Sequence, residues 1–285
     1  MPRADARCYR AAVSDSLRHD AVERAVPDIS APDISAPDIS VPDISVIVPV
    51  RNEAANIAPL VAEIRAALAG SAFEIVYIDD GSTDGTTASL DAARGPDLTW
   101  RRHRIGCGQS AAIVTGVRVA RGAWIATLDG DGQNDPADLP ALLAHGRREA
   151  ERGPWPVLVA GHRTTRRDSW VKRRTSRLAN ALRASLLRDA TPDTGCGLKV
   201  FRREAFLELP HFDHMHRYLP ALFIRAGGRV VSVPVNHRPR TQGRSNYGTL
   251  DRLWVGVFDL FGVFWLQRRW RRPEIEPASS GSAGA

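Results

Sequence analysis

From residue 44 onward the sequence alternates short apolar runs with segments of helical periodicity, and this alternation constrains the fold more than any other feature. The run SVIVPV is rich in β-branched residues, which is typical of a buried parallel strand. Apolar residues then recur at helical spacing over residues 57–68, and Gly70 is placed to end that helix. Strands that alternate with helices predict an α/β protein with a doubly wound, mostly parallel sheet.

The same alternation continues toward residue 140. FEIVYIDD is a second buried strand that ends in acid, LTWRRH is a weaker third, and AWIATLD is a fourth that again ends in acid. A helix is expected over about residues 109–120. Another is expected to begin at Asp135, because a capping aspartate, Pro136 in the first turn and Asp138 near the positive end of the dipole are typical of a helix start.

Polar clusters follow three of these strands. They are Arg51, Asn52 and Glu53 after the first strand, Asp79 and Asp80 after the second, and Asp129 and Asp131 after the fourth. In open α/β sheets, ligands bind beyond the carboxyl ends of the strands. A single acid in such a place is often a helix cap, but three clusters at one edge predict a binding site.

The segment LDGDGQND has the most specific chemistry. Asp129 and Asp131 are separated by one glycine, so both carboxylates can turn onto one hard cation. Magnesium or manganese prefers such oxygen ligands, completed by water and substrate phosphates, and Gln133 offers another oxygen. The alternative is a polar turn, in which glycine and aspartate are common.

Five segments together resemble a known family. PVRNEAANI, IDDGSTDGT and LDGDGQNDP look like the nucleotide-sugar half of the family-two inverting glycosyltransferases of GT-A fold. TGCGLKVFRREAF and HRPRTQGRSNYG resemble the polyprenyl-phosphate branch, typified by dolichol-phosphate mannosyltransferase. The resemblance covers about residues 43–247. It implies metal-dependent, inverting transfer of a sugar, with mannose favoured, from GDP-mannose or a UDP-sugar to a polyprenyl phosphate.

The resemblance also implies a role for each matching residue. Pro49, Glu53, Asp79 and Asp80 would line the base and ribose; Asp129, Asp131 and Gln133 would hold Mg²⁺ or Mn²⁺; Asp193 would lie near the acceptor; Lys199, Arg240, Arg244 and Ser245 belong to segments that bind substrate phosphates. Arginine stands at 244 where lysine is commoner, and lysine at 199 where arginine is frequent. The positive charge is kept at both positions. Arginine can bind two phosphate oxygens at once, whereas lysine acts as a point charge, so the type of contact differs from the family's usual one at each position.

The expected mechanism follows from charge. Cleavage of the sugar–phosphate bond leaves a nucleoside diphosphate with extra negative charge, so the metal and Arg240 and Arg244 are needed where that charge develops. The acceptor is a phosphomonoester whose second pKa is about 6, so it is already largely dianionic at pH 7. Asp193 is therefore expected to orient the acceptor or balance charge, and an obligatory base is not required.

The charge balance and the motifs exclude several other functional classes of protein. Basic residues exceed acidic ones by 39 to 32, and only two of the 39 are lysine, so the net +7 is carried by arginine, which binds phosphate well. A nucleic-acid-binding protein would not explain three acidic clusters, and a dinucleotide oxidoreductase needs a glycine fingerprint after its first strand. A phosphatase with an aspartyl nucleophile would carry its acid pair after the first strand, whereas this chain carries it after the fourth. The remaining rivals are a transferase with a soluble or polysaccharide acceptor and a non-catalytic scaffold on a membrane.

Two segments suggest contact with an anionic membrane surface. Residues 163–188 contain nine basic side chains beside an apolar helical face, which favours a membrane-surface helix over the solvated face of an ordinary one. Residues 253–266 are apolar, aromatic and followed by arginines, but as a helix they extend only about 21 Å. With Asp259 at their centre, they predict a helix lying in the membrane interface, and packing on the domain or a dimer surface is the alternative.

The predicted organisation has four parts. Residues 1–43 are a disordered leader with four PDIS repeats, interpreted as a duplicated lead-in to the first strand in preference to a docking motif. The glycosyltransferase domain takes residues 44–248, the interface helix 249–272 and a disordered tail 273–285. Three distant cysteines and a first segment without an apolar core indicate a reducing compartment and no secretory signal. A cytoplasmic protein that is peripheral on the inner face of the membrane is expected.

Overall fold

Strand residues alternate between two cores, one on each face of the central sheet. In the computed structural model, which describes residues 41–163, 183–189, 191–239 and 249–269, Val46 and Val48 of the first strand belong to one core and Ile47 to the other. In the next strand Tyr77 and Ile78 divide in the same way. Successive side chains of a strand point to opposite faces, so a continuous apolar run needs cover on both sides.

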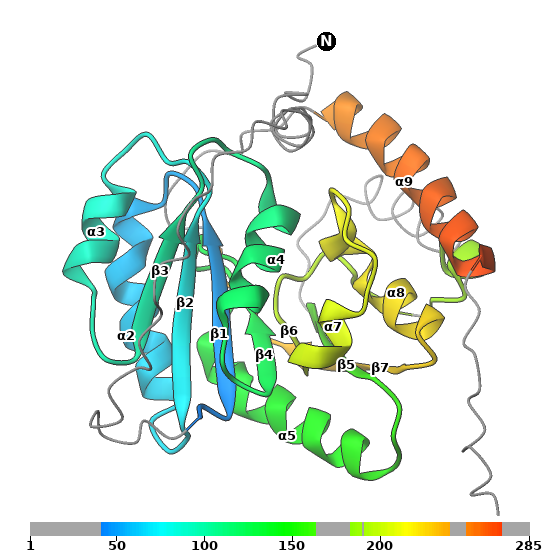
Figure 1. Ribbon diagram of the computed structural model, residues 1–285, viewed down its shortest axis with the longest axis horizontal. Coiled ribbons are helices and arrows are strands. Elements are labelled where there is room, and N and C mark those ends of the chain that lie inside the picture. Colours follow the sequence, from blue (N-terminus) through cyan, green and yellow to red (C-terminus); the bar gives the residue numbers. More distant parts are fainter. Residues whose placement is uncertain (1–40, 164–182, 190, 240–248, 270–285) are drawn as a thin grey trace, which may run out of the picture. The chain divides into compact units, whose positions relative to one another are not determined.

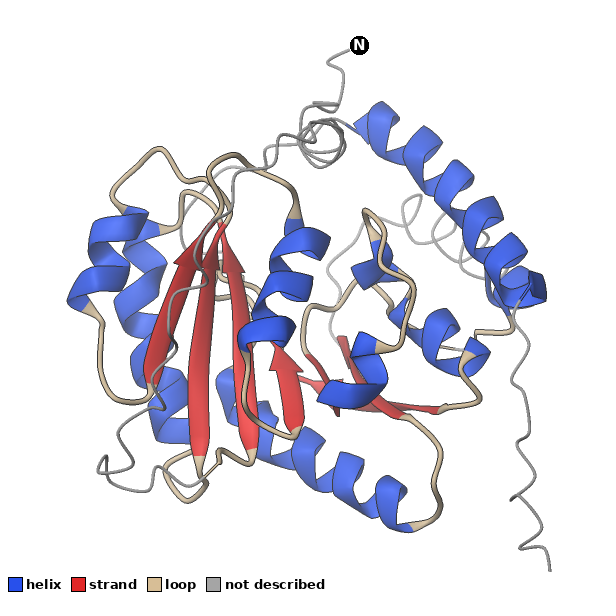
Figure 2. Cartoon of the chain, viewed as in Figure 1, coloured by secondary structure: helices blue, strands red, loops and turns tan. Residues whose placement is uncertain are grey.

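The sheet joins seven strands in the described part of the chain. They are β1 (Ile44–Val50), β2 (Phe73–Asp79), β3 (Leu98–Arg102), β4 (Trp124–Thr127), β5 (Val157–Arg163), β6 (Lys199–Arg202) and β7 (Arg229–Val235). Their order is β3-β2-β1-β4-β6-β5-β7, and every pairing is parallel except the two that β6 makes with β4 and β5 (Figure 2). The predicted mostly parallel α/β sheet is confirmed.

Helices cover both faces (Figure 1). They are η1 (Ala54–Asn56), α2 (Ile57–Ala67), α3 (Thr86–Ala92), α4 (Gln109–Val119), η2 (Pro136–Asp138), α5 (Leu139–Glu151), α7 (Arg203–Leu207), η3 (Met215–Arg217), α8 (Leu219–Arg225) and α9 (Thr249–Arg269). Buried residues of α2, α3 and α5 pack in one core, and those of α4, α7, η3, α8 and α9 in the other.

The predicted helix boundaries are close to the observed ones. Asp135 caps the start of η2 by accepting a hydrogen bond from the Ala137 N–H at 3.0 Å, as expected. Gly70 does not end α2, because Leu68 takes the cap position and its N–H donates to the Ile64 carbonyl. Leu68 is buried in the core, so the chain leaves the helix there and reaches Gly70 through a turn.

The topology brings the predicted site together. Strands β1, β2, β3 and β4 are parallel, so their carboxyl ends lie at one edge of the sheet. Strand β6 runs the other way, and its first residue, Lys199, pairs with Thr127 at the end of β4. The antiparallel strand therefore delivers the loop that precedes it to the same edge.

No helix in the described ranges combines the length and the apolar content needed to cross a bilayer.

Residues 1–40 of the predicted leader (1–43), residues 164–182 of the basic stretch and the whole predicted tail (273–285) lie outside the described residues, as do the predictions made for them.

Candidate active site

The loop after β4 holds two carboxylates at the sheet edge. The Asp129 N–H donates to the Asn134 side chain at 3.1 Å, and the amide of Gln109, at the start of α4, donates to Asp129 Oδ1 at 2.7 Å. Asp131 Oδ1 accepts the backbone N–H of Gln133 at 3.1 Å. The loop is therefore fixed from both sides, and Asp129 is oriented by a residue that sequence reasoning had not selected.

Gly197 gives the Asp129 carboxylate its space. A Cβ atom added to Gly197 would lie 2.2 Å from Asp129 Oδ2 and 2.3 Å from its Cγ. The Gly197 carbonyl also accepts a hydrogen bond from Thr127 Oγ1 at 2.6 Å. The carboxylate thus packs directly against the backbone that leads into β6, which only glycine permits at this distance.

The charge around Asp129 fits a divalent cation. Burial, followed by the nearby negative charge of Asp131, raises the pKa of Asp129, and the positive charges of Lys199 and Arg163 only partly oppose this. A buried carboxylate whose ionisation is disfavoured, in a site with hard oxygen donors, is stabilised by Mg²⁺ or Mn²⁺. The residues present fit the predicted metal.

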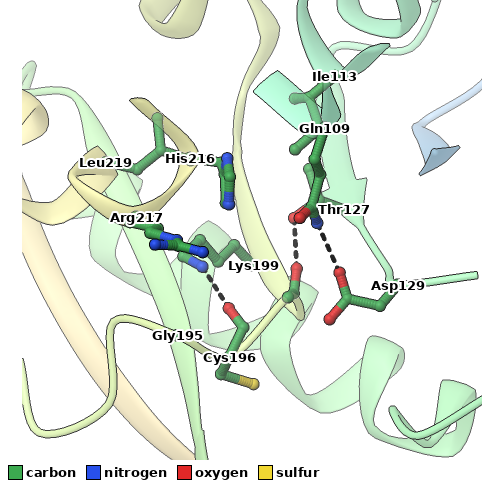
Figure 3. A pocket seen from close by; sticks show the side chains of 11 residues that line it. Gln109, Ile113, Thr127, Asp129, Gly195, Cys196, Lys199, His216, Arg217 and Leu219 are labelled. Carbon is green, nitrogen blue, oxygen red and sulfur yellow. Dashed lines mark hydrogen bonds between the residues drawn. The ribbon is translucent and has the colours of Figure 1, made fainter. Parts of the chain in front are cut away.

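A cavity of about 250 Å³ opens beside this carboxylate. Its lining comes from the α4 start, the β4 end, the loop before β6 and the segment η3–α8: Gln109, Ile113, Thr127, Asp129, Gly195, Cys196, Gly197, Lys199, His216, Arg217 and Leu219. Figure 3 shows Gln109 and Asp129 on one side of it and His216 and Arg217 on the other. Acidic and basic groups therefore face a common space of the size of a sugar or a phosphate group.

Two of the lining side chains are held in defined states. The Lys199 side chain is buried, and its ammonium group donates to the carbonyls of Thr194, at 3.4 Å, and of Cys196. Burial lowers the pKa of Lys199. Burial also lowers the pKa of His216 to about 3, so this ring is neutral at pH 7; its Nδ1 lies 2.8 Å from Ser110 Oγ.

Asp193 lies in the loop that precedes β6 and forms a bidentate ion pair. Arg163, at the end of β5, donates from Nε to Asp193 Oδ2 at 2.6 Å and from the guanidinium Nη2 to Oδ1 at 2.9 Å. Only 8% of the Asp193 side chain is exposed. The hydrogen bond to Asp193 is the main reason that the pKa of Arg163 is raised. Because the pair spans 30 residues, spacing in the sequence gave no sign of it.

The acids after β2 are bound within the protein. Asp79 is fully buried and accepts the Ser82 N–H at 2.8 Å and the Thr87 hydroxyl at 2.9 Å, so it fixes the turn that begins α3. Asp80 accepts hydrogen bonds from the N–H groups of Cys107 and Gly108, both at 2.8 Å.

Asp80 also links the loop before α4 to β3. His103 Nδ1 lies 2.7 Å from Asp80 Oδ1. Burial would raise the pKa of Asp80, but the hydrogen bonds from His103, Cys107 and Gly108 outweigh it and lower this pKa. Ligand atoms of Asp80, His103 and Cys107 come within 4.8 Å of one another, and these hydrogen bonds account for that grouping.

The residues at the end of β1 lie beside the β2 loop at the same edge of the sheet. Pro49 lies within β1, opposite Ile78, and Glu53 accepts the Asn56 amide at 2.6 Å. Asn52 has a left-handed backbone, with φ of 59°, and its side chain accepts the Thr83 N–H at 2.8 Å. Asparagine tolerates that conformation better than most residues, and here it ties the β1 and β2 loops together.

Residues 45–209 match the family model described as "Glycosyl transferase family 2". The chain belongs to this family. The predicted resemblance is thereby confirmed, and the three clusters at the sheet edge fall within the matched residues.

Relatives of this family-two glycosyltransferase have names that refer to polyprenyl phosphates. It is 34% identical over 236 residues to "Dodecaprenyl-phosphate galacturonate synthase" of Rhizobium johnstonii, an alignment that covers 80% of this chain and 68% of that one. It is also 34% identical to "Undecaprenyl-phosphate 4-deoxy-4-formamido-L-arabinose transferase" of Enterobacter sp., with 75% and 65% covered. The chain thus spans about two thirds of the length of these relatives.

Solved structures confirm the GT-A type of fold. Glucosyl-3-phosphoglycerate synthase from Mycobacterium tuberculosis, in complex with Mn²⁺, UDP and glucosyl-3-phosphoglycerate, superposes with a TM-score of 0.56 at 20% identity, covering 79% of this chain and 80% of that one. The same enzyme in complex with Mg²⁺ and UDP gives a TM-score of 0.55 at 19% identity, covering 79% of each chain.

The structure places nine of the twelve predicted site residues. Those at the carboxyl ends of β1, β2 and β4 gather at the sheet edge, and the loop before β6 brings Asp193 and Lys199. Arg240, Arg244 and Ser245 lie outside the described residues. Sequence reasoning did not identify Gln109, Arg163 or Gly197. The second glycine of TGCGLK, two residues before the matched lysine, was the one local signal among them.

Proposed function

We propose that this glycosyltransferase moves a sugar from a nucleotide-sugar to the phosphate of a polyprenyl phosphate, with inversion at the sugar carbon. The observation that carries the proposal is the cavity in which Asp129 faces Arg217 across the space beside Lys199. A carboxylate pair suits a metal-bound diphosphate, and cations suit a phosphate acceptor. The names of the relatives support the same acceptor class.

Asp129 and Asp131 would hold Mg²⁺ or Mn²⁺, with Gln133 as a third ligand. Such an ion supplies positive charge where the departing nucleoside diphosphate becomes more negative. Gln109 holds the orientation of Asp129 through its 2.7 Å hydrogen bond, so one carboxylate oxygen is fixed before substrate arrives. Pro49, Glu53, Asp79 and Asp80 remain our assignment for the base and ribose side. The assignment comes from the family resemblance, and these residues lie at or near the ends of β1 and β2.

The attacking group is the acceptor phosphate, which is largely dianionic at neutral pH and needs no strong base. Asp193 is already paired with Arg163. We therefore propose that Asp193 holds the Arg163 guanidinium beside the acceptor phosphate. Lys199 lines the cavity. Arg240, Arg244 and Ser245, in the segment that follows β7 in the sequence, would complete the phosphate contacts. His216 is neutral and suited to hydrogen bonding with a sugar hydroxyl.

The donor is tested with a panel of nucleotide-sugars. GDP-mannose was favoured by the sequence resemblance, whereas the relatives named above refer to galacturonate and to a formamido-arabinose. We expect one sugar to be transferred to undecaprenyl phosphate or dolichyl phosphate in a reaction that EDTA stops and Mg²⁺ or Mn²⁺ restores. The measurement is radiolabelled lipid product extracted into organic solvent.

The same panel separates the rivals. Transfer to soluble sugars or a polysaccharide, with none to the lipid phosphates, would contradict the acceptor assignment. Absence of transfer and of nucleotide binding under every condition would favour the scaffold.

Helix α9 has one face against the protein and one face outward. Asp259 lies 3.3 Å from His214, and Val263 is 1% exposed in the second core. Outward lie Phe258, Phe261 and Trp265, which are 73%, 59% and 57% exposed. Exposed aromatic residues on an amphipathic helix are typical of a membrane interface. We propose that this face docks on the membrane that carries the acceptor.

Replacing Phe258, Phe261 and Trp265 together with serine should lower partitioning onto anionic vesicles by roughly 100-fold or more, because each apolar side chain contributes about 1.5–3 kcal/mol on burial. High salt should weaken binding of the unaltered protein only partly, since it screens charge and leaves apolar contact. Vesicle co-sedimentation measures both effects.

The matched control is Phe206→Ser, which removes an aromatic ring from the core and should lower the melting temperature without this selective loss. If the triple variant binds vesicles normally and instead dissociates a dimer, the exposed face is a subunit interface.

A further inference from the structure

A second cavity, of about 310 Å³, lies between α8, α9 and residues 186–188. Its lining combines apolar and cationic groups: Leu186, Arg188, Ile224, Arg225, Phe264, Gln267 and Arg268. Three of these seven side chains are arginines, and the lining contains no carboxylate among the described residues. It shares no residue with the cavity beside Asp129. A pocket with this composition suits an anion that is attached to an apolar body.

The walls of this cavity are fixed to one another. Arg225 Nε donates to the Leu266 carbonyl at 3.0 Å, which joins the end of α8 to α9. The Gln267 amide donates to the carbonyls of Leu187, at 2.9 Å, and of Ala221, at 3.2 Å. The guanidinium of Arg268 lies over the Phe264 ring, 3.8 Å from its centroid. The site is thus built by contacts among three elements and does not depend on a single helix end.

Two of the arginines carry signs of a specialised position. Arg188 has a left-handed backbone, with φ of 53°, a conformation that normally favours glycine. Strained positions of this kind persist where the surrounding structure or a function requires them. Arg225 is partly buried, and burial lowers its pKa, which reflects a cation withdrawn from water.

The cavity borders the outward face of α9. Residues three and four apart lie on the same side of a helix, so Arg268 follows Trp265 and Phe264 by one turn. Trp265 and Phe261 belong to the exposed aromatic face, while Phe264 and Gln267 line the cavity. The cavity therefore adjoins the helix face that we propose to contact the membrane.

We propose that this cavity binds the phosphate head group of an anionic phospholipid, separately from the acceptor phosphate in the reaction site. The three arginines hold the phosphate, and Leu186, Ile224 and Phe264 contact the start of the acyl region. The bound lipid would fix the orientation of α9 and α8 on the membrane, and α8 follows directly on η3, which carries His216 and Arg217. The proposal rests on the proposed function only in taking the membrane as the source of the ligand.

The test uses the full chain and a short-chain lipid, dihexanoyl phosphatidylglycerol, below its critical micelle concentration, so that no membrane surface is present. Phosphorus NMR titration measures its affinity. We expect binding that is at least tenfold tighter than that of dihexanoyl phosphatidylcholine or of inorganic phosphate. Arg268→Gln should weaken it roughly fivefold, since one basic side chain near an anionic lipid contributes about that much.

Arg269→Gln is the matched control, because it removes the same charge from the next position of α9 and Arg269 does not line the cavity. It should alter the affinity less than twofold. Arg188→Gln gives a second test away from the helix, in case Arg268→Gln disturbs folding as judged by circular dichroism. Equal losses in Arg268→Gln and Arg269→Gln would overturn the pocket, and equal affinity for inorganic phosphate would overturn the lipid. The titration contains neither nucleotide-sugar nor polyprenyl phosphate, so its failure is distinguishable from failure of the transferase activity.

Discussion

Replacing Asp129 with asparagine should lower sugar transfer by roughly 100- to 1,000-fold, the usual effect of removing one group that stabilises developing charge. The same change should raise the melting temperature of the protein in EDTA. Asparagine keeps the shape and an oxygen that can accept the Gln109 hydrogen bond, but it removes a buried negative charge beside Asp131. Activity assays and thermal unfolding of the same preparation measure the two opposite effects.

The pH dependence has a definite sign. Burial and the charge of Asp131 raise the pKa of Asp129 in the folded state above its unfolded value. A carboxyl group of this kind stabilises the fold when protonated, and that contribution is lost as pH rises through the folded-state pKa. The stability gained by Asp129→Asn should therefore be absent at low pH and grow toward neutral pH. Added Mg²⁺ or Mn²⁺ should raise the melting temperature of the unaltered protein more than that of the variant.

Asp135→Asn is the control for this experiment. Asp135 lies in the same loop, but it accepts the Ala137 N–H and pairs with Arg238 at 2.7 Å, so its charge is stabilising. The control should lose stability and keep most of its turnover. A variant at Asp129 that works normally in excess metal, or that melts earlier than the parent protein in EDTA, would contradict the metal assignment.

The strands and helices of the first half of the fold, and the candidate site residues that follow these strands, could be predicted because the sequence patterns that indicate them are local. Each of β1, β2 and β4 is a continuous apolar run that ends in polar residues, and parallel strands place those ends at one edge. Asp80, Asp129 and Asp131 could therefore be selected from position alone. The apolar signal of α9 covers residues 253–266, whereas the helix extends over the 21 residues Thr249–Arg269, because its first and last turns are mainly polar.

The second half depends on contacts between distant residues. Strand β6 has only four residues and pairs antiparallel with both neighbours, which no periodicity indicates. That reversal delivers Lys199 to the sheet edge and buries it. The pair Arg163–Asp193 and the hydrogen bond from Gln109 to Asp129 likewise join separate elements. Sequence reasoning therefore selected charged groups at the strand ends, and did not select several of the groups that hold them in position.

Gly197→Ala tests one of those positioning groups, and it should lower turnover by about 100-fold although Gly197 carries no functional group. The new Cβ would lie 2.2 Å from Asp129 Oδ2, far inside contact distance, and the loop cannot retreat freely because the Gly197 carbonyl accepts the Thr127 hydroxyl at 2.6 Å. The Asp129 carboxylate must then move by about 1 Å, a displacement that can reduce catalysis by that factor. Because the displaced Asp129 carboxylate is a metal ligand in our proposal, the concentration of Mn²⁺ needed for half-maximal turnover should rise as well.

Gly195→Ala is the matched control, since it makes the same substitution two residues earlier in the same loop. Its Cβ would lie 3.4 Å from the Arg163 guanidinium and 3.6 Å from Asp193, distances at which a methyl group is accommodated. It should keep turnover and metal dependence within about threefold, as surface-loop substitutions that meet no clash usually do. Overpacking at Gly197 also costs about 1–3 kcal/mol of stability, so urea unfolding must accompany the kinetics to show that the protein assayed is folded. A folded Gly197→Ala protein with normal metal dependence would mean that Asp129 can be displaced without consequence, and the metal would then have to be held by other residues.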